Sequence, residues 1–237
     1  MPLDFLGIGA QKAGTTWLYE NLRRHPGIFL REVKEIHFWD GRRDRGFEWY
    51  RSLFVNKPEG SKAGEITPAY AILPVEVIRE IWTEFPGIRL IYLIRNPMDR
   101  AWSSALMALG RAEMTIDEAS DQWFLDHFRS QGSLRRGDYE TCLRNWRSVY
   151  PDDSILVVLF EEIQQAPLAV LRRVAAHIGI DPSFFATVPM SALKEPVFAG
   201  LKHAIRPSPA AALAEIYAPK IERLARYLGR DLSHWRR

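Results

Sequence analysis

Apolar runs alternate with amphipathic stretches along the chain. The runs at Arg89–Ile94 and Ile155–Phe160 are almost continuously apolar, which is typical of parallel strands covered on both faces. Phe5–Ala10 and Ala63–Thr67 are also predicted to be strands, the second ended by Pro68. Because helical stretches follow these strands, the pattern predicts an α/β fold in which helices flank a central parallel sheet.

The helical stretches are recognised by apolar residues three or four positions apart. They are predicted at Thr15–Arg24, Phe47–Phe54, Val75–Phe85, Met98–Leu109, Asp117–Phe128 and Tyr139–Tyr150, with two more over Leu168–Ile178 and Leu213–Leu228. Arg31–Arg45 is predicted to be a charged loop region. The sequence has no repeat and no clear linker, so residues 1–237 are expected to form a single domain.

Composition narrows the possible functions. The chain has 237 residues, 47% of them hydrophobic, with a formal net charge of +3, which alone does not imply nucleic-acid binding. The single cysteine, Cys142, excludes an intrachain disulfide and a cysteine-rich metal site, and is expected to be buried. The N-terminal residues have neither a basic segment nor a long apolar one, so we expect no signal peptide, no membrane association and a cytoplasmic location.

Three segments lie at the carboxyl ends of predicted strands: Gln11–Thr16, Glu65–Tyr70 and Arg95–Ser104. In open parallel sheets, ligands bind beyond the carboxyl ends of the strands. These segments are therefore where we expect the functional residues.

The first segment has the character of a phosphate loop. Helix N-termini present free backbone N–H groups to anions, Gly14 allows close approach, and Lys12 adds a full charge. Nucleoside triphosphatases place the lysine directly after the last glycine, whereas Lys12 precedes Gly14. Arg95 also stands where a magnesium-binding aspartate would be expected, so both features argue against an ATPase or kinase. The alternative to a phosphate loop is an ordinary strand-to-helix turn.

The third segment can bind a second anion. Arg95 ends a strand and Ser103 lies on the following helix, so the two side chains can converge on one phosphate. Arg100 is more readily interpreted as structural, paired with a carboxylate.

The run Gln11–Leu18 resembles the 5'-phosphosulfate loop of sulfotransferases that use 3'-phosphoadenosine 5'-phosphosulfate (PAPS), especially the branch with the heparan sulfate sulfotransferases and their bacterial relatives. The resemblance implies a P-loop-like three-layer domain. It also implies that Lys12 contacts the bridging oxygen and the leaving phosphate, and that Arg95 and Ser103 bind the 3'-phosphate. The loop residues implied to bind the donor are Gln11, Lys12, Ala13, Gly14, Thr15, Thr16 and Trp17.

Sulfuryl transfer to a hydroxyl also requires a base that removes the proton of the acceptor. Glu65 lies in a segment that resembles the family's Glu-x-Thr/Ser-Pro-x-Tyr, which makes it the expected base. Lys34 and His37 lie in a segment that resembles Lys-Glu-x-x-Phe, so Lys34 is expected near the transferring group. His37 is either an acceptor-side hydrogen-bond partner, a packing residue or the alternative base.

Two donor contacts are expected later in the chain. Tyr139, in a segment resembling Gly-x-Tyr, either lines the nucleotide pocket or packs in the core. Lys202 is expected to touch a donor phosphate from a loop in which His203 replaces the usual aromatic residue. The segment Gly229–Trp235 resembles the usual ending of these chains, which implies a nearly complete catalytic domain.

The resemblance therefore implies sulfuryl transfer from PAPS to a hydroxyl or amine, with release of adenosine 3',5'-bisphosphate and without a metal. The acceptor would be a glycan or a small molecule, free or carrier-bound. The alternatives are a P-loop-type small-molecule kinase and a non-enzymatic nucleotide- or polyanion-binding protein.

Overall fold

The computed structural model describes residues 3–194 and 203–236. The chain forms two compact units, each built from two chain segments. The sheet unit consists of Met1–Ile94 and Asn145–Val197, and the helical unit of Arg95–Arg144 and Phe198–Arg237. That the whole chain acts as one domain stays a prediction.

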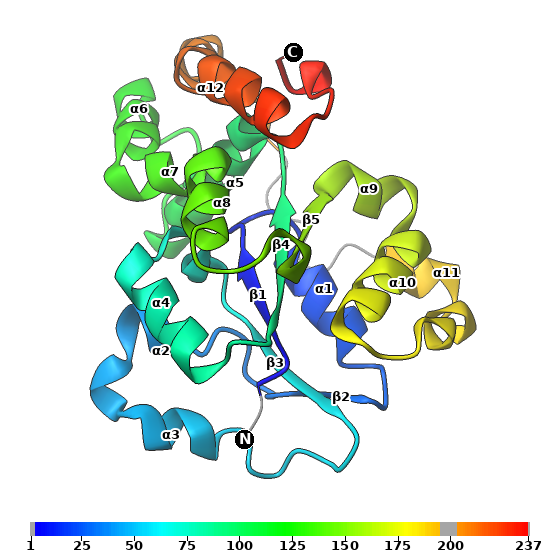
Figure 1. Cartoon of the computed structure of the whole chain (residues 1–237). Coiled ribbons are helices and arrows are strands. Elements are labelled where there is room, and N and C mark those ends of the chain that lie inside the picture. Colours follow the sequence, from blue (N-terminus) through cyan, green and yellow to red (C-terminus); the bar gives the residue numbers. More distant parts are fainter. Residues whose placement is uncertain (1–2, 195–202, 237) are drawn as a thin grey trace. The chain divides into compact units, whose positions relative to one another are not determined.

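The sheet unit is built on five parallel strands in the order β2-β3-β1-β4-β5 (Figure 1). The strands are β1 Phe5–Gly9, β2 Ile28–Leu30, β3 Lys62–Ile66, β4 Arg89–Ile94 and β5 Ile155–Leu159. β1 lies at the centre, paired with β3 on one side and β4 on the other. The predicted central parallel sheet is thus confirmed, and the carboxyl ends of all five strands lie at one edge of it.

Helices cover both faces of this sheet. Figure 1 shows α1, α9 and α10 on one side of the sheet and α2 and α4 on the other. The helices of the sheet unit are α1 Thr15–Leu22, α2 Phe38–Gly41, α3 Phe47–Ser52, α4 Val75–Glu84, α9 Phe160–Gln165, α10 Pro167–Ile178 and α11 Met190–Lys194. The predicted flanking helices are therefore present.

The apolar pattern explains this packing. Every residue of β4 from Leu90 to Ile94 is fully buried, as expected for a strand with helices on both faces. Along α10, the residues that recur at helical spacing, such as Leu171, Val174 and Ile178, are likewise buried. Burying one such side chain stabilises the fold by about 1.5–3 kcal/mol.

The helical unit contains α5 Pro97–Arg111, α6 Asp121–Arg129, α7 Gln131–Arg136 and α12 Pro207–Leu228; α8, Tyr139–Arg147, begins in it. Arg100 of α5 is fully buried, and its Nη2 donates to the carbonyl oxygen of Ser133 at 3.1 Å and lies 3.4 Å from the hydroxyl of Tyr217. Arg100 is thus structural, as interpreted from the sequence, but among the described residues it contacts a carbonyl oxygen and hydroxyls rather than a carboxylate.

Three short elements depart from the sequence prediction. β2 was not predicted because three residues are too few to establish a strand pattern. Within the predicted charged loop, Phe38–Gly41 forms one helical turn, α2, whose aromatic residues are buried. Phe160 begins α9 instead of ending the strand, because Glu162 accepts a hydrogen bond from the N–H of Leu159 and caps the helix.

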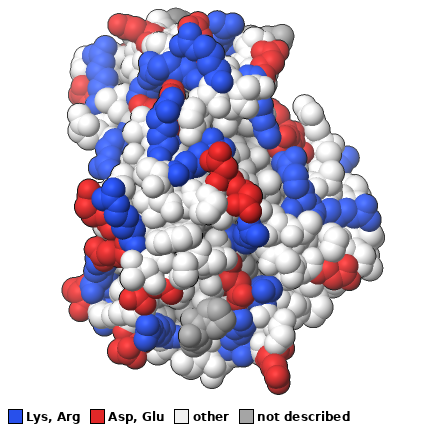
Figure 2. Space-filling model, viewed as in Figure 1, with Lys and Arg blue, Asp and Glu red and all other residues white. Residues whose placement is uncertain are grey.

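The surface carries charges of both signs. On the face displayed in Figure 2, Lys and Arg side chains are interspersed with Asp and Glu, which agrees with the small formal net charge of +3. Cys142 is 3% exposed, so its predicted burial is confirmed. Within residues 3–194 and 203–236, no helix is long and apolar enough to cross a membrane.

Candidate functional site

The loop between β1 and α1 has the backbone of an anion-binding turn. Lys12 and Gly14 both adopt left-handed conformations, with φ of 67° and 90°. A Cβ atom on Gly14 would also lie 3.2 Å from the ring of Phe160, so the backbone conformation favours glycine and the space beside it is tight. Because Gly14 precedes the first helical residue and has no side chain to accept from the helix, the first N–H groups of α1 remain available to a ligand.

A second cation reaches this loop from the following segment. The Lys34 ammonium lies 3.4 Å from the hydroxyl of Thr15 and 2.8 Å from a carboxylate oxygen of Glu35. Together with Lys12 and the partial charge of the helix N-terminus, Lys34 makes the loop electropositive. The structure therefore brings the predicted residue Lys34 beside the phosphate loop.

Lys34 begins a chain of ionic contacts. Glu35 Oε1 faces Lys34, and Glu35 Oε2 lies 3.2 Å from His37 Nε2. The other ring nitrogen of His37, Nδ1, lies 2.9 Å from a carboxylate oxygen of Asp40. Asp40 thus orients the imidazole so that Nε2 points at Glu35. The Glu35 side chain is 39% exposed, so its carboxylate is accessible to a substrate.

Glu65, the base expected from the sequence, lies in a different environment. It is the fourth residue of β3 and is only 3% exposed. One carboxylate oxygen accepts hydrogen bonds from the hydroxyls of Tyr50 (2.5 Å) and Tyr70 (3.1 Å), and the other accepts from Thr67 (2.8 Å). Both oxygens are thus engaged by protein hydroxyls, which favours a structural role for Glu65 over proton transfer to a substrate.

Burial raises the pKa of Glu65 to about 7, because desolvation of the carboxylate outweighs the three hydroxyl hydrogen bonds that lower it. The folded protein therefore holds this proton more tightly than the unfolded chain, whose glutamates have a pKa of 4.5. The stability from the protonated group is fully present below pH 4.5 and is lost as the pH rises through 7.

We therefore predict that Glu65→Gln, which cannot ionise, becomes progressively more stable relative to the parent protein between pH 4.5 and 8. The difference in unfolding free energy should change by roughly 3 kcal/mol across this range. Urea denaturation of both proteins at several pH values measures it. A difference that does not vary with pH would contradict the buried, high-pKa assignment.

The second predicted anion-binding pair belongs to the helical unit, where Arg95 precedes α5 and Ser103 lies on it. Arg95 Nη2 lies 3.8 Å from a carboxylate oxygen of Asp99, and Ser103 lies one turn further along α5. The hydroxyl of Tyr139 donates to the carbonyl oxygen of Arg95 at 2.8 Å. Tyr139 is 2% exposed and its pKa is raised by burial, so it supports the backbone at Arg95 as a buried residue.

Four other residues were also predicted to bind the donor. Trp17 is 6% exposed and its indole N–H donates to the carbonyl oxygen of Leu193 at 2.7 Å, so its side chain packs in the core. Gln11 is half-buried in the loop, and Ala13 is buried. Lys202 lies outside the described residues.

Sequence reasoning missed Glu35 and Asp40. Glu35 was treated only as part of the motif around Lys34. The usable signal was local: Glu35, His37 and Asp40 form an acidic–imidazole–acidic set within six residues of a loop that follows the phosphate loop. What the sequence did not provide is the left-handed backbone at Glu35 (φ 68°) and His37 (φ 58°), which lets the three side chains meet.

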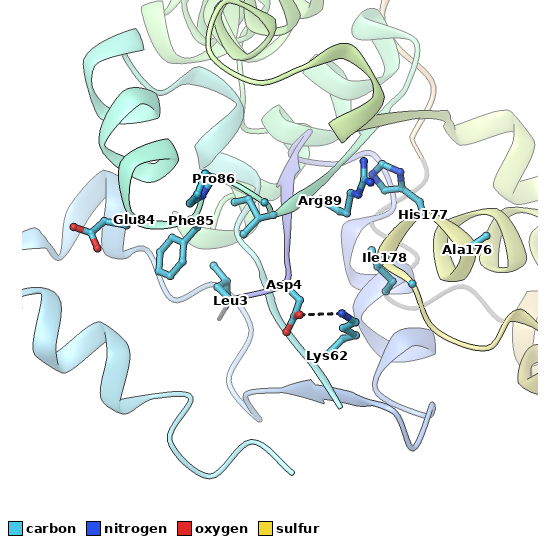
Figure 3. A pocket seen from close by; sticks show the side chains of 13 residues that line it. Leu3, Asp4, Lys62, Glu84, Phe85, Pro86, Arg89, Ala176, His177 and Ile178 are labelled. Atoms are coloured by element: carbon cyan, nitrogen blue, oxygen red, sulfur yellow. Dashed lines mark hydrogen bonds and ion pairs between the residues drawn. The ribbon is translucent and has the colours of Figure 1, made fainter. Parts of the chain in front are cut away.

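A cavity of about 720 Å³ lies at the opposite edge of the sheet, where β1, β3 and β4 begin. Figure 3 shows Asp4 and Lys62 paired in it, with Arg89 and His177 close together on another wall. Arg89 also contacts Asp153, and the His177 ring lies 3.1 Å from the carbonyl oxygen of Leu90. This cavity is distinct from the loops at the carboxyl ends of the strands.

Comparisons with known proteins find related sequences. A family model described as "Sulfotransferase domain" matches residues 2–203, a range that includes residues of both units. Mouse heparan sulfate glucosamine 3-O-sulfotransferase 3A1 is 32% identical over an alignment of 181 residues that covers 73% of this chain and 44% of the relative. The chain spans about half the length of the curated relatives it matches.

Solved structures share the fold. A sulfotransferase from Alicyclobacillus acidocaldarius matches with a TM-score of 0.77 and 25% identity, covering 100% of this chain and 99% of that one. The mouse sulfotransferase SULT7A1, solved in complex with PAP, matches with a TM-score of 0.62 and 21% identity over 95% of this chain and 88% of that one.

Proposed function

The chain belongs to the family described by the sulfotransferase domain, and from this premise we propose that it transfers a sulfuryl group from PAPS to an acceptor hydroxyl or amine. The observation that supports this most directly is the position of Lys34, which joins the phosphate loop at Thr15 to an accessible carboxylate, Glu35. A cationic loop for a phosphosulfate and a base for an acceptor then adjoin one another.

The donor assignment follows the residues of the loop. In our proposal Lys12, Gly14, Thr15 and Thr16 bind the 5'-phosphosulfate through backbone N–H groups, hydroxyls and the ammonium. Gln11, Ala13 and Trp17 contribute as members of the same turn.

The other end of the donor is assigned by the family resemblance. Arg95 and Ser103 would bind the 3'-phosphate, supported by Tyr139 behind the Arg95 backbone. Lys202 is retained as a donor contact on the same basis.

We assign the base to Glu35 rather than to Glu65. A general base must reach the proton it removes, and the Glu35 carboxylate is accessible beside Lys34 whereas both oxygens of Glu65 accept hydrogen bonds from buried hydroxyls. His37 acts through Glu35 and does not take the proton itself: its Nε2 faces Glu35, so it orients that carboxylate.

In the reaction, Glu35 takes the proton of the acceptor hydroxyl as its oxygen attacks sulfur. The new O–S bond forms while the bond from sulfur to the 5'-phosphate oxygen breaks, which yields the sulfated acceptor and adenosine 3',5'-bisphosphate. Negative charge that develops on the leaving oxygen is stabilised by Lys12 and the N–H groups of α1. Lys34 stabilises the transferring group.

The acceptor is proposed to be a hydroxyl-bearing glycan or small molecule, because the curated relatives are heparan sulfate sulfotransferases by name. The predictions of a carrier-bound acceptor and of a cytoplasmic location remain predictions. The kinase alternative is not favoured, because Lys12 precedes Gly14 and Arg95 stands where a magnesium-binding aspartate would be expected.

A transfer assay with sulfur-35-labelled PAPS tests the proposal. We expect label to appear in at least one member of a panel of glycosaminoglycans and phenolic or alcoholic small molecules, with one adenosine 3',5'-bisphosphate released for each sulfate transferred. Mass spectrometry identifies the product, and ATP with magnesium in place of PAPS serves as the control. If calorimetry detects no binding of adenosine 3',5'-bisphosphate and no panel member is labelled, the proposal fails.

A further inference from the structure

Glu65 is connected to the backbone beside Glu35 through the hydroxyl of Thr67. Thr67 Oγ1 donates to Glu65 at 2.8 Å and accepts from the N–H of Ile36 at 3.1 Å. A hydroxyl has one proton, so once that proton is directed at the carboxylate the oxygen presents only lone pairs to its other neighbours. Glu65 thereby fixes Thr67 as an acceptor for Ile36.

Tyr70 makes the same kind of connection two and three residues further along, at Phe38 and Trp39. Its hydroxyl donates to Glu65 at 3.1 Å and accepts from the N–H groups of Phe38 (3.0 Å) and Trp39 (3.4 Å). Tyr50 completes the cluster: its hydroxyl donates to Glu65, and its ring stacks on Phe38 with centroids 4.5 Å apart. The backbone of residues 36–39 is therefore anchored on hydroxyls and a ring that surround one carboxylate.

This anchoring matters because the segment has an unfavourable backbone conformation. Glu35 and His37 adopt left-handed φ values of 68° and 58°, which residues other than glycine rarely adopt. Such conformations persist only where the surrounding structure holds them. The anchored N–H groups of Ile36 and Phe38 directly follow Glu35 and His37.

We infer that Glu65 is a positioning residue: its carboxylate fixes the hydroxyls of Thr67 and Tyr70, which hold the backbone that presents Glu35 and His37. The effect on catalysis, through Glu35 as the base, rests on the proposed function. Its structural part, the anchoring of residues 36–39 by Glu65, stands independently of any activity.

Replacing Glu65 by Gln and by Ala separates positioning from proton transfer. The amide oxygen of Gln can accept from both tyrosines, as Glu65 Oε1 does, and Thr67 can rotate to accept from the amide nitrogen. Glu65→Gln should therefore keep kcat within about tenfold of the parent, whereas Glu65→Ala should lower it by up to about 100-fold. The Kd of adenosine 3',5'-bisphosphate should be unchanged in both.

A base would behave differently, because an amide cannot take up the proton. Equal losses of kcat in Glu65→Gln and Glu65→Ala would therefore overturn the inference, and so would an unchanged kcat in Glu65→Ala. If Glu65→Ala does not fold, Tyr70→Phe replaces it, since this change removes one hydroxyl and keeps the ring.

Tyr150→Phe is the matched control for Tyr70→Phe. Tyr150 is another buried tyrosine of the sheet unit, 1% exposed, whose hydroxyl donates to the carbonyl oxygen of Phe85 at 3.3 Å. We expect kcat to fall about tenfold or more in Tyr70→Phe and to stay within about twofold of the parent in Tyr150→Phe. Equal kcat values in the two variants would contradict the positioning role.

Amide hydrogen exchange tests the anchoring without reference to activity. In Tyr70→Phe the N–H groups of Phe38 and Trp39 should exchange faster than in the parent protein, and in Tyr150→Phe their exchange should not change. If no acceptor is sulfated but exchange changes as expected, the proposed function fails and the anchoring stands. If exchange at 36–39 is the same in both variants, the anchoring fails whatever the activity.

Discussion

Glu35→Gln is expected to lower kcat by about 10²- to 10⁴-fold, the usual contribution of a general base. The variant keeps the size of the side chain and removes only its ability to accept a proton. Because the donor is assigned to the phosphate loop and to Arg95 and Ser103, the Kd of adenosine 3',5'-bisphosphate should change little. Steady-state kinetics with PAPS and calorimetry with the bisphosphate measure the two quantities.

Glu32→Gln is the matched control. Glu32 precedes Glu35 by three residues, and the residue is exposed on the same segment. The same loss of one negative charge at that position should leave kcat within about twofold of the parent, because an exposed charge outside the reacting centre contributes little. If Glu35→Gln were as active as Glu32→Gln, Glu35 would not be the base.

Lys12→Met is expected to lower kcat by about 10²- to 10³-fold, the typical loss when one group that stabilises developing charge is removed. Met keeps most of the length of the lysine stem, so the change removes mainly the ammonium that we propose to lie beside the leaving phosphate oxygen. Donor affinity should also fall, but less than kcat, because the charge on that oxygen is largest in the transition state.

Lys62→Met removes the same charge at the opposite edge of the sheet. Lys62 pairs with Asp4, which also accepts from Lys57, so this loss leaves Asp4 with a cationic partner. We expect a normal kcat and at most a small loss of stability. Should Lys12→Met weaken donor binding and leave kcat unchanged, Lys12 would bind ground state and transition state equally and would have no specific role at the leaving oxygen.

The parts of the site that depend on local sequence could be predicted. A strand followed by a small-residue turn and a helix start is a contiguous pattern, so Lys12 and Gly14 were placed in a phosphate loop from the sequence alone. The structure has this strand, turn and helix, and Gly14 is the residue immediately before α1. The buried strands β4 and β5 were equally predictable, because apolar residues at nearly every position distinguish them from amphipathic helices.

The burial of the Glu65 carboxylate could not be predicted because its environment is assembled from distant residues. Tyr50 comes from α3, fifteen positions earlier, and reaches Glu65 only after the sheet and α3 have packed. The sequence therefore indicated an acidic residue near the end of a strand but gave no sign that its carboxylate is enclosed. Glu35 was missed for the converse reason: its segment has no regular hydrophobic period from which its backbone could be inferred.

The order of the chain through the sheet unit has a consequence for synthesis. β4 ends at Ile94 and its neighbour β5 begins only at Ile155, after most of the helical unit. A ribosome adds roughly 5–20 residues per second, so the intervening stretch of about 60 residues takes roughly 3–12 s. During that time the nascent chain presents the outer edge of an apolar strand without its neighbour, which is a template for association between nascent chains. Additional chaperone, which covers the exposed edge during this time, should thus raise the soluble yield in a recombinant host.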